Sequence, residues 1–397
     1  MAHSARIQLP PVPLFSMTAV EPLRQLVAAG GVPGPHGFLP PYEPLRRLPQ
    51  GFEAWEELAS DVSALYLVGR VRRDLAALPE LDPMLLADGP EAERAMLLLT
   101  FFAGAYVHQT EPPAASLPPP LARPLVALSR RLGRPPILSH ASLAMHNWRR
   151  LDPSGPIEVE NLVNLVGIHG STDETWFLTI AVAIEACGGE EPARIVRLEM
   201  AAEEEDAATV AAELGRLSET IGHITVLTER TREGCDPHVF YRRVRPPFSG
   251  WFEPGVRYEG TDLAEPLVLA GGSAAQSPLI QCFDAVLSVQ QPEAARGPHL
   301  DMRRYMDPRH RRFVSAVEES GAVRRFAAAT GDSAVRNAYD SALEALAELR
   351  RVHLAIVNDY IVRQADPGTA ARGTGGTDFR RFLGGAIAGT ERARLEN

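Results

Sequence analysis

One histidine, His353, lies within an apolar helical stripe and has the chemistry of a buried metal ligand. Between residues 338 and 365, apolar side chains recur at three- and four-residue steps, which predicts a helix that buries one face. His353 falls on that face. A buried imidazole must either hydrogen-bond within the core or ligate a metal, because an unsatisfied buried polar group costs about 1–3 kcal/mol. The pattern leaves both readings open, and a hydrogen-bonded core histidine is the commoner case.

Two glycine-containing runs could bring the backbone close to a ligand. Residues 373–377 read Gly-Thr-Gly-Gly-Thr and follow the predicted helix that contains His353. A glycine-rich segment so soon after a candidate metal ligand suggests a mobile lid over a metal centre. Residues 271–277 combine glycine, alanine and serine before an apolar helix, whose N-terminus offers N–H donors to an anion. The second run is equally explained as a tight loop with Ser273 or Ser277 as the N-cap.

The segment from residue 240 to 251 mixes four aromatic residues with three arginines. The segment reads Phe-Tyr-Arg-Arg-Val-Arg-Pro-Pro-Phe-Ser-Gly-Trp. Such a mixture could stack a planar substrate while one arginine holds a carboxylate in a bidentate grip. It could equally be a corner of the core whose arginines face water.

Composition narrows the class of protein. With 397 residues the chain exceeds the usual size of a single core, so two domains are expected, divided at residues 1–167 and 168–397. The net charge of -10, with no long basic tract, disfavours a nucleic-acid partner. Three scattered cysteines without a C-x-x-C pair indicate neither a disulfide framework nor a zinc ribbon. No signal segment or long apolar run is evident, so a cytoplasmic protein is expected that neither enters nor crosses a membrane.

Helical periodicity predicts a mainly α fold. Proline is frequent up to Pro49, which favours an extended start, and convincing alternating strands are few. H-E-x-x-H, Walker and strand-borne G-x-G-x-x-G motifs are absent, which disfavours hydrolase and nucleotide-binding readings. Helices are predicted at 52–78, 91–108, 174–187, 193–229, 277–289, 310–320, 323–330 and 338–365.

Taken together, several strings resemble the indoleamine 2,3-dioxygenase family. They occur in the family's order, and the likeness extends over nearly the whole chain after about residue 36. The strings lie at 37–40, 105–107, 135–138, 147–148, 240–251, 258–260, 271–277, 281–284 and 301–306, with His353 and 373–378 after them.

The resemblance implies a haem enzyme. A smaller N-terminal domain would cap a larger helical one, with b-type haem between them and His353 as the proximal ligand of its iron. Arg350, one turn before His353, would lie near a haem propionate, and Asp284 would shape the haem environment. In the family, ferrous haem and O2 cleave the indole C2–C3 bond of L-tryptophan to give N-formylkynurenine, so a reductant, unidentified here, is also implied.

The resemblance also assigns the substrate pocket. Arg245 would bind the substrate carboxylate, and Phe240 and Tyr241 would pack on the indole. Ser273 and Ala274 would border both haem and substrate, and Thr374 would close the pocket over the amino-acid part of the substrate.

Some positions depart from the family pattern. Tyr241 replaces a second phenylalanine, Trp176 is matched to a distal phenylalanine and Ile180 to a distal serine. His140 is matched to a tyrosine near the distal pocket, which gives the hypothesis that it hydrogen-bonds the indole N–H or iron-bound oxygen. The alternatives are a haem monooxygenase acting on a substituted indole in secondary metabolism, a non-catalytic haem protein that binds O2, and a helical scaffold without haem.

Overall fold

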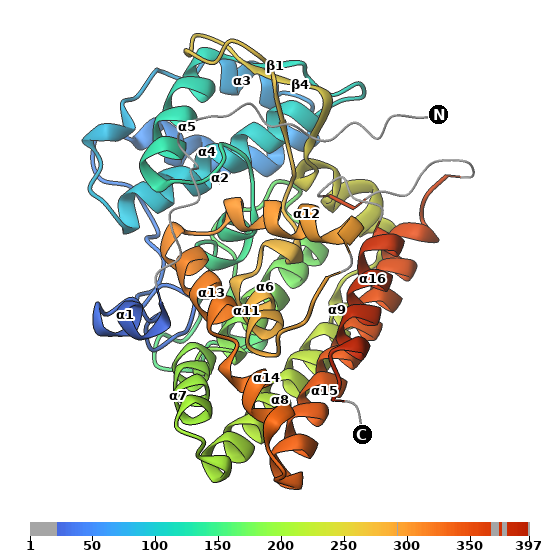
Figure 1. The fold of residues 1–397 in the computed structure, drawn as a ribbon. Helices are drawn as coiled ribbons and strands as arrows, with labels where there is room; N and C mark the ends of the chain where they lie inside the picture. The colour runs from blue at the N-terminus through green and yellow to red at the C-terminus, as the bar shows by residue number, and fades with distance from the viewer. Residues whose placement is uncertain (1–21, 292, 367–372, 375–378, 396–397) are drawn as a thin grey trace.

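The computed structural model confirms the mainly α fold. It describes residues 22–291, 293–366, 373–374 and 379–395. Figure 1 shows one group of helices, α2 to α5, gathered at the top, and the longest helices, α8 and α15, side by side at the bottom. After the short helix α1 (Leu23–Ala28), the upper group consists of α2 (Glu53–Leu67), α3 (Val71–Ala76), the 3₁₀ turn η2 (Pro83–Leu85), α4 (Pro90–His108) and α5 (Pro119–Leu132).

The apolar helix α4 is the centre of the upper group. Its run from Leu97 to Phe102 is fully buried, as its hydrophobicity all round predicts. Helix α5 begins inside the proline-rich stretch because prolines occupy its first turn, where a missing N–H costs nothing. It ends at Gly133, whose φ of 66° gives the left-handed C-terminal conformation.

Short strands tie distant parts of the chain together. Strand β4 (Trp251–Tyr258) pairs in parallel with β1 (Ser116–Leu117) and antiparallel with β5 (Leu267–Leu269). Strand β2 (Arg149–Arg150) pairs antiparallel with β3 (Leu162–Val163), just after the 3₁₀ turn η4 (Val159–Asn161). Because β1 lies between α4 and α5, its pairing with β4 places the chain directly after the aromatic and arginine segment beside the upper helices.

The lower part is a helical bundle. Its helices are α6 (Thr172–Cys187), α7 (Glu191–Glu203), α8 (Ala207–Glu229), α9 (Thr231–Gly234), α10 (Pro237–Val239), α11 (Pro278–Val286), α12 (Glu293–Met302), α13 (Pro308–Ser320), α14 (Ala322–Ala329), α15 (Ser333–Val357) and α16 (Phe379–Arg392), with 3₁₀ turns η6 (Pro246–Phe248), η7 (Ala274–Gln276) and η8 (Arg303–Tyr305). Helix α15 packs along α8 and α16. Asp332 caps its N-terminus by accepting from the N–H groups of Ala334 and Val335.

Two buried apolar clusters meet along α15. The first joins the upper helices to the β4–β5 region and includes Val352 and Ile356 of α15. The second joins α6, α7, α8, α11 and α13 and includes Leu343 and Leu346, two turns earlier on the same helix. Helix α15 therefore passes from one core to the other, and His353 lies near that junction.

Three segments of the described chain are π-helical: η3 (Ala141–Met145), η5 (Phe240–Val244) and η9 (Asn358–Val362). A π turn inserts an extra residue into a helical turn and re-aims the side chains around it, and it often occurs at functional sites. All three of these turns border the cavity described below.

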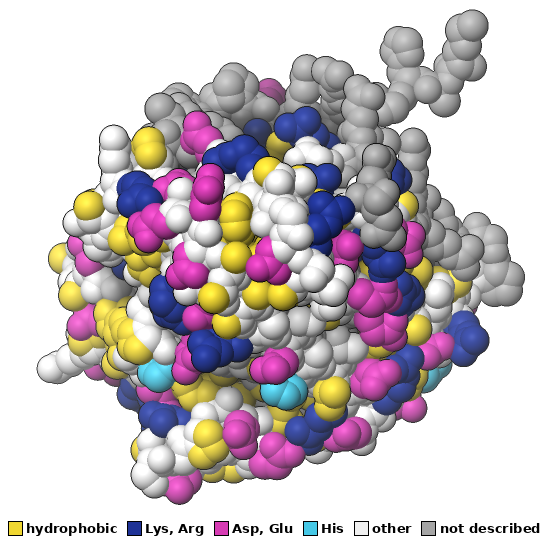
Figure 2. Space-filling model, turned by 60° about the horizontal axis from the view of Figure 1, so that its bottom comes forward, with side chains coloured by type: hydrophobic (Ala, Val, Ile, Leu, Met, Phe, Trp, Pro, Cys, Tyr) yellow, Lys and Arg dark blue, Asp and Glu magenta, His cyan; other side chains and the backbone are white. Residues whose placement is uncertain are grey.

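Opposite charges are mixed on the face of the molecule shown in Figure 2. In Figure 2 the Lys and Arg side chains are interspersed with Asp and Glu, and positive charge is not gathered into one patch on this face. None of the described helices is both long and apolar enough to cross a membrane.

Candidate functional site

A cavity of about 330 Å³ lies where the two apolar clusters meet. Its walls come from α6, α8, η5, the 272–277 loop, α11, α15 and α16, and most of its lining is apolar. A small number of polar groups interrupt that lining, which is the usual make-up of a ligand or cofactor site. These groups include His140, Glu185, Arg245, Ser273, Asp284, Arg350, His353 and Thr374.

His353 projects from α15 into this cavity. The imidazole forms no hydrogen bond with any described residue. The part of the side chain that is accessible faces the cavity, and the ring is shielded from bulk solvent. Burial lowers the pKa of His353, so the ring is neutral at pH 7 and keeps a lone pair. A neutral imidazole without a protein partner is the form of histidine that ligates a metal.

Arg350, one turn before His353, forms a buried ion pair with Asp284 of α11. The side chains of Arg350 and Asp284 are only 8% and 5% exposed. Arg350 also donates to the carbonyl oxygen of Ala386 at 3.1 Å and to the hydroxyl of Thr390, while Gln291 donates to the second Asp284 oxygen at 3.1 Å. The expected pair of cofactor residues therefore forms one network that joins α11, α15 and α16.

The aromatic and arginine segment contributes another part of the cavity wall. The Phe240 ring lies 4.7 Å from Phe177 and 5.7 Å from Tyr360, between ring centroids. The Arg245 guanidinium lines the cavity, and burial lowers its pKa from the usual value of arginine. Tyr241 is not among the described residues that line the cavity; its ring instead packs against Arg245, 5.5 Å from the guanidinium carbon. Tyr241 thus contacts the arginine, and its packing on an indole stays a prediction.

Thr374 forms hydrogen bonds with the start of the loop that contains Ser273 and Ala274. Its carbonyl oxygen accepts from the N–H groups of Gly250 and Gly271 at 3.0 and 3.2 Å, and its hydroxyl donates to Gly272 O at 2.5 Å. Gly271 is required here, because a Cβ at that position would overlap the carbonyl oxygen of Phe248. Ser273, Ala274 and Thr374 all line the cavity.

The sequence-based prediction of a mobile lid falls largely on residues that the structure does not describe. Within the run 373–377, only Gly373 and Thr374 are described, and both line the cavity. The remaining three residues lie outside the described part of the chain.

Trp176, expected to border the substrate, is not among the described residues that line the cavity. Its indole N–H donates to the carbonyl oxygen of Arg230 at 2.8 Å, and the Arg230 guanidinium lies over its ring, away from the cavity. Phe177 takes the cavity-facing place, because successive residues on an α-helix point about 100° apart. Four residues later, Ala181 lines the same wall as Phe177, alongside Ile180. Phe177 is therefore the aromatic residue of this pair that lines the cavity, and the role expected for Trp176 stays a prediction.

His140 forms a buried polar cluster with a residue that sequence reasoning missed. Its Nε2 lies 2.8 Å from Oε1 of Glu185, and the Ser277 hydroxyl donates to the same oxygen at 2.5 Å. The backbone N–H of His140 donates to Gln276 at 2.9 Å. Glu185 could have been found as a lone carboxylate within the apolar helix at 174–187, eight residues after Phe177 and thus on the same face.

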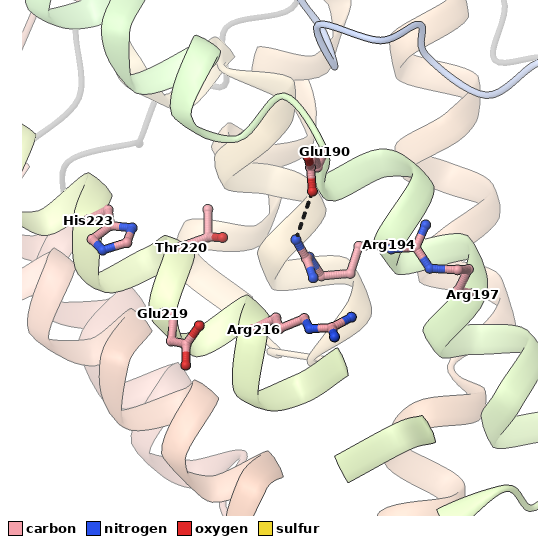
Figure 3. A pocket seen from close by; sticks show the side chains of 7 residues that line it. All are labelled: Glu190, Arg194, Arg197, Arg216, Glu219, Thr220 and His223. Atoms are coloured by element: carbon pink, nitrogen blue, oxygen red, sulfur yellow. Dashed lines mark hydrogen bonds and ion pairs between the residues drawn. The ribbon is translucent and has the colours of Figure 1, made fainter. Parts of the chain in front are cut away.

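A second hollow, of about 340 Å³, lies on the surface between α7 and α8. Figure 3 shows its arginine and glutamate side chains, with Arg194 directed toward Glu190. Arg194 also contacts Glu191 at 2.9 Å and Glu213 at 3.2 Å, so its charge is already compensated. This hollow is a salt-bridged surface feature, and His353 is not among the residues that line it.

Comparison with known proteins identifies the family. The family model for indoleamine 2,3-dioxygenase matches residues 31–393. The chain belongs to the indoleamine 2,3-dioxygenase family. It is 31% identical to human indoleamine 2,3-dioxygenase 2 over 369 residues, which cover 88% of this chain and 90% of that protein. It is 36% identical to indoleamine 2,3-dioxygenase acdA of Aspergillus candidus, with 87% and 92% covered. It is 31% identical to 6-hydroxytryptophan 2,3-dioxygenase fscD of Fusarium equiseti, with 87% and 92% covered.

Membership makes the chain an oxidoreductase of the haem-dependent tryptophan and indole 2,3-dioxygenase type. The cavity fits that cofactor. A neutral imidazole that hydrogen-bonds none of the described residues faces an apolar space, and a buried arginine follows on the same wall one helical turn away. A haem bound here would find a ligand for its iron in His353, an apolar enclosure in the cavity lining and a cation for a propionate in Arg350.

Proposed function

We propose that the protein binds haem b through His353 and cleaves the indole C2–C3 bond of L-tryptophan, or of a related indole amino acid, with O2. One observation carries this proposal: the His353 imidazole and the Arg245 guanidinium line the same largely apolar cavity. The first suits an iron and the second suits the carboxylate of an amino acid, with apolar walls between them for a flat ring.

The product would be of the N-formylkynurenine type. When bound, ferrous haem supplies the activation of dioxygen. The C2–C3 double bond is broken, each of the two carbons becomes a carbonyl carbon, and both oxygen atoms come from one O2, so turnover consumes no net reductant. Keeping the iron ferrous requires a separate reductant of unidentified origin.

The protein side chains would bind and orient the substrate. Arg245, oriented by Tyr241, would hold the carboxylate, and Phe240 with Phe177 would pack on the indole ring. Ser273 and Ala274 would border the ring, and Thr374 would close the cavity beside the amino-acid part. These apolar walls would exclude water from the reacting bond.

Arg350 and Asp284 would set the charge beside the haem. A propionate near Arg350 would share a guanidinium that Asp284 already neutralises, so Asp284 would limit how strongly Arg350 attracts that anion.

The partners of His140 restrict its proposed role. Glu185 engages the Nε2 atom of His140, so Nδ1 is the ring nitrogen that would contact a ligand in the cavity. A hydrogen bond from His140 to the substrate or to oxygen would therefore involve Nδ1.

A product assay tests the proposal. Protein expressed with a haem precursor is reduced and mixed with L-tryptophan, and separately with ring-substituted tryptophans, under ¹⁸O2. Products that gain two labelled oxygen atoms support the dioxygenase. A product with one labelled atom would indicate a monooxygenase, and a red protein that binds O2 without any product would indicate an oxygen-binding role. Protein that remains colourless would contradict the assignment of His353.

A further inference from the structure

The segment expected to bind the substrate is closed by a π-type hydrogen bond. The Arg245 N–H donates to Phe240 O, five residues earlier, at 2.8 Å. In an α-helix, side chains five residues apart point about 140° apart, because successive residues are rotated by about 100°. The wider π turn reduces that angle, and both Phe240 and Arg245 line the cavity. The ring-packing and carboxylate-binding residues of the proposed site are therefore parts of one local unit, η5.

Tyr360 connects this unit to the helix that carries His353. The π turn η9 follows α15 directly, and Tyr360 lies about two helical turns after His353. Both side chains line the cavity. Tyr360 is 3% exposed, and its ring packs edge-on against Phe240, with 5.7 Å between ring centroids and an interplanar angle of 72°. The helix of the expected iron ligand and the turn of the expected substrate residues thus meet at this ring contact.

The hydroxyl of Tyr360 holds the chain that leads into η5. It donates to Cys235 O at 2.6 Å and lies 3.3 Å from Thr231 O. Burial raises the pKa of Tyr360 to about 12, so the hydroxyl keeps its hydrogen at neutral pH, and a carbonyl oxygen can only accept. Asp236, next to Cys235, accepts from the Phe240 N–H through its carbonyl oxygen at 2.9 Å. Tyr360 therefore contacts the Phe240 ring and also holds the backbone that precedes it.

We infer that Tyr360 is a positioning residue, which fixes the Phe240 wall relative to His353 and so sets how a bound indole faces the reacting centre. The inference rests on the proposed function, in which Phe240 packs on the indole. A misplacement of the reacting groups by about 1 Å can lower a rate by about 100-fold. Binding is less sensitive, because Coulomb attraction to Arg245 and burial of apolar surface vary only gradually with position. Loss of the Tyr360 contacts should therefore reduce kcat far more than it weakens binding.

Two substitutions at Tyr360 test the inference. Tyr360→Phe removes the hydroxyl and keeps the ring, and Tyr360→Leu removes both. The reduced, haem-loaded protein would be assayed for kcat per bound haem with L-tryptophan, and the equilibrium dissociation constant of L-tryptophan would be measured by dialysis without O2. Tyr360→Leu is expected to lower kcat by about 100-fold and to raise the dissociation constant by no more than about fivefold. Tyr360→Phe, which retains the ring contact with Phe240, should recover a large part of the lost kcat.

Tyr258 provides the matched control. Its hydroxyl donates to Pro136 O at 2.5 Å, and its ring packs edge-on against Trp251, with 5.4 Å between centroids. Tyr258 is 2% exposed and is not among the described residues that line the cavity. Tyr258→Phe and Tyr258→Leu remove the same kinds of contact as the changes at Tyr360, so urea denaturation should show comparable losses of stability. Their kcat per bound haem and their dissociation constant for L-tryptophan should stay within about twofold of wild type.

Three results would overturn the inference. Unchanged kcat in both Tyr360 variants would show that the ring contact does not position the substrate. Weakened binding with kcat preserved would make Tyr360 part of the binding surface rather than a positioning residue. A matching loss of kcat in the Tyr258 variants would attribute the effect to stability alone. Wild-type protein that oxygenates no indole amino acid would instead overturn the proposed function on which the inference rests, and this outcome is recognised before any variant is compared.

Discussion

Replacing Arg245 with alanine should selectively impair substrates that carry a carboxylate. The guanidinium is half-buried in the cavity wall, so a carboxylate that pairs with it loses most of its water. Truncating one partner of a desolvated charge pair typically costs about 2–5 kcal/mol, and partial exposure of Arg245 favours the lower part of that range, about 2–4 kcal/mol. At 1.36 kcal/mol per factor of ten, this corresponds to a loss in kcat/KM of roughly 30- to 900-fold.

The assay compares L-tryptophan with tryptamine, which has the same ring and amine but no carboxylate. In Arg245→Ala, kcat/KM for L-tryptophan should fall by that factor, whereas the value for tryptamine should change by only about threefold. Arg242→Ala is the matched control, because Arg242 also packs on the Tyr241 ring, at 5.4 Å, but forms an exposed ion pair with Asp366. An exposed pair is worth only about 0–1 kcal/mol, so the control should keep the wild-type substrate ratio.

Equal losses for L-tryptophan and tryptamine in Arg245→Ala would refute the reasoning. Such a result would mean that Arg245 supports the shape of the cavity, through Tyr241 and its neighbours, rather than the carboxylate.

Three further predictions follow from buried groups. His353→Ala should abolish the haem absorption band while the far-ultraviolet circular dichroism stays close to that of wild type, since the imidazole hydrogen-bonds no described residue; retention of an unchanged haem spectrum would contradict its role as ligand. Asp284→Ala should lower the free energy of unfolding, measured by urea denaturation, by about 3–5 kcal/mol, because it leaves the Arg350 charge buried and without its carboxylate partner. The double variant Asp284→Ala/Arg350→Met should recover much of that loss. Additive losses in the two single variants and the double variant would argue against the coupling. Burial raises the pKa of Glu199 to about 7, above its unfolded value of 4.5, so the folded state binds more protons between these values and stability falls as pH rises from about 4.5 to 7. Glu199→Gln should therefore stabilise the protein at pH 8 by up to about 3 kcal/mol and flatten the dependence of its melting temperature on pH; a variant less stable than wild type at pH 8 would contradict this.

The local pattern of the chain was enough to predict the helices and the position of His353 on a buried face. The apolar stripe between residues 338 and 365 corresponds to α15 followed by a π turn, because a helix that packs on a core must place apolar residues at three- and four-residue steps. The apolar run near residue 97 became the buried helix α4 for the same reason. The order of the matched strings was likewise sufficient to predict the family, which the comparisons confirmed.

Periodicity could not predict the rotation of each helix about its axis. A shift of one residue separates Trp176, which faces Arg230, from Phe177, which faces the cavity. Both residues are aromatic, so composition does not distinguish them. Packing of the whole helix against its neighbours decided between them.

The pairing of polar groups also depended on the tertiary structure. Arg350 is 66 residues from its partner Asp284, and His140 is 45 residues from Glu185. Each residue by itself is compatible with a surface role in the sequence. The sequence by itself determined which side chains are available for chemistry and which segments are helical, since both follow from residue type and local periodicity. Only the fold decided which of them share one cavity, because burial forces distant polar groups to satisfy one another.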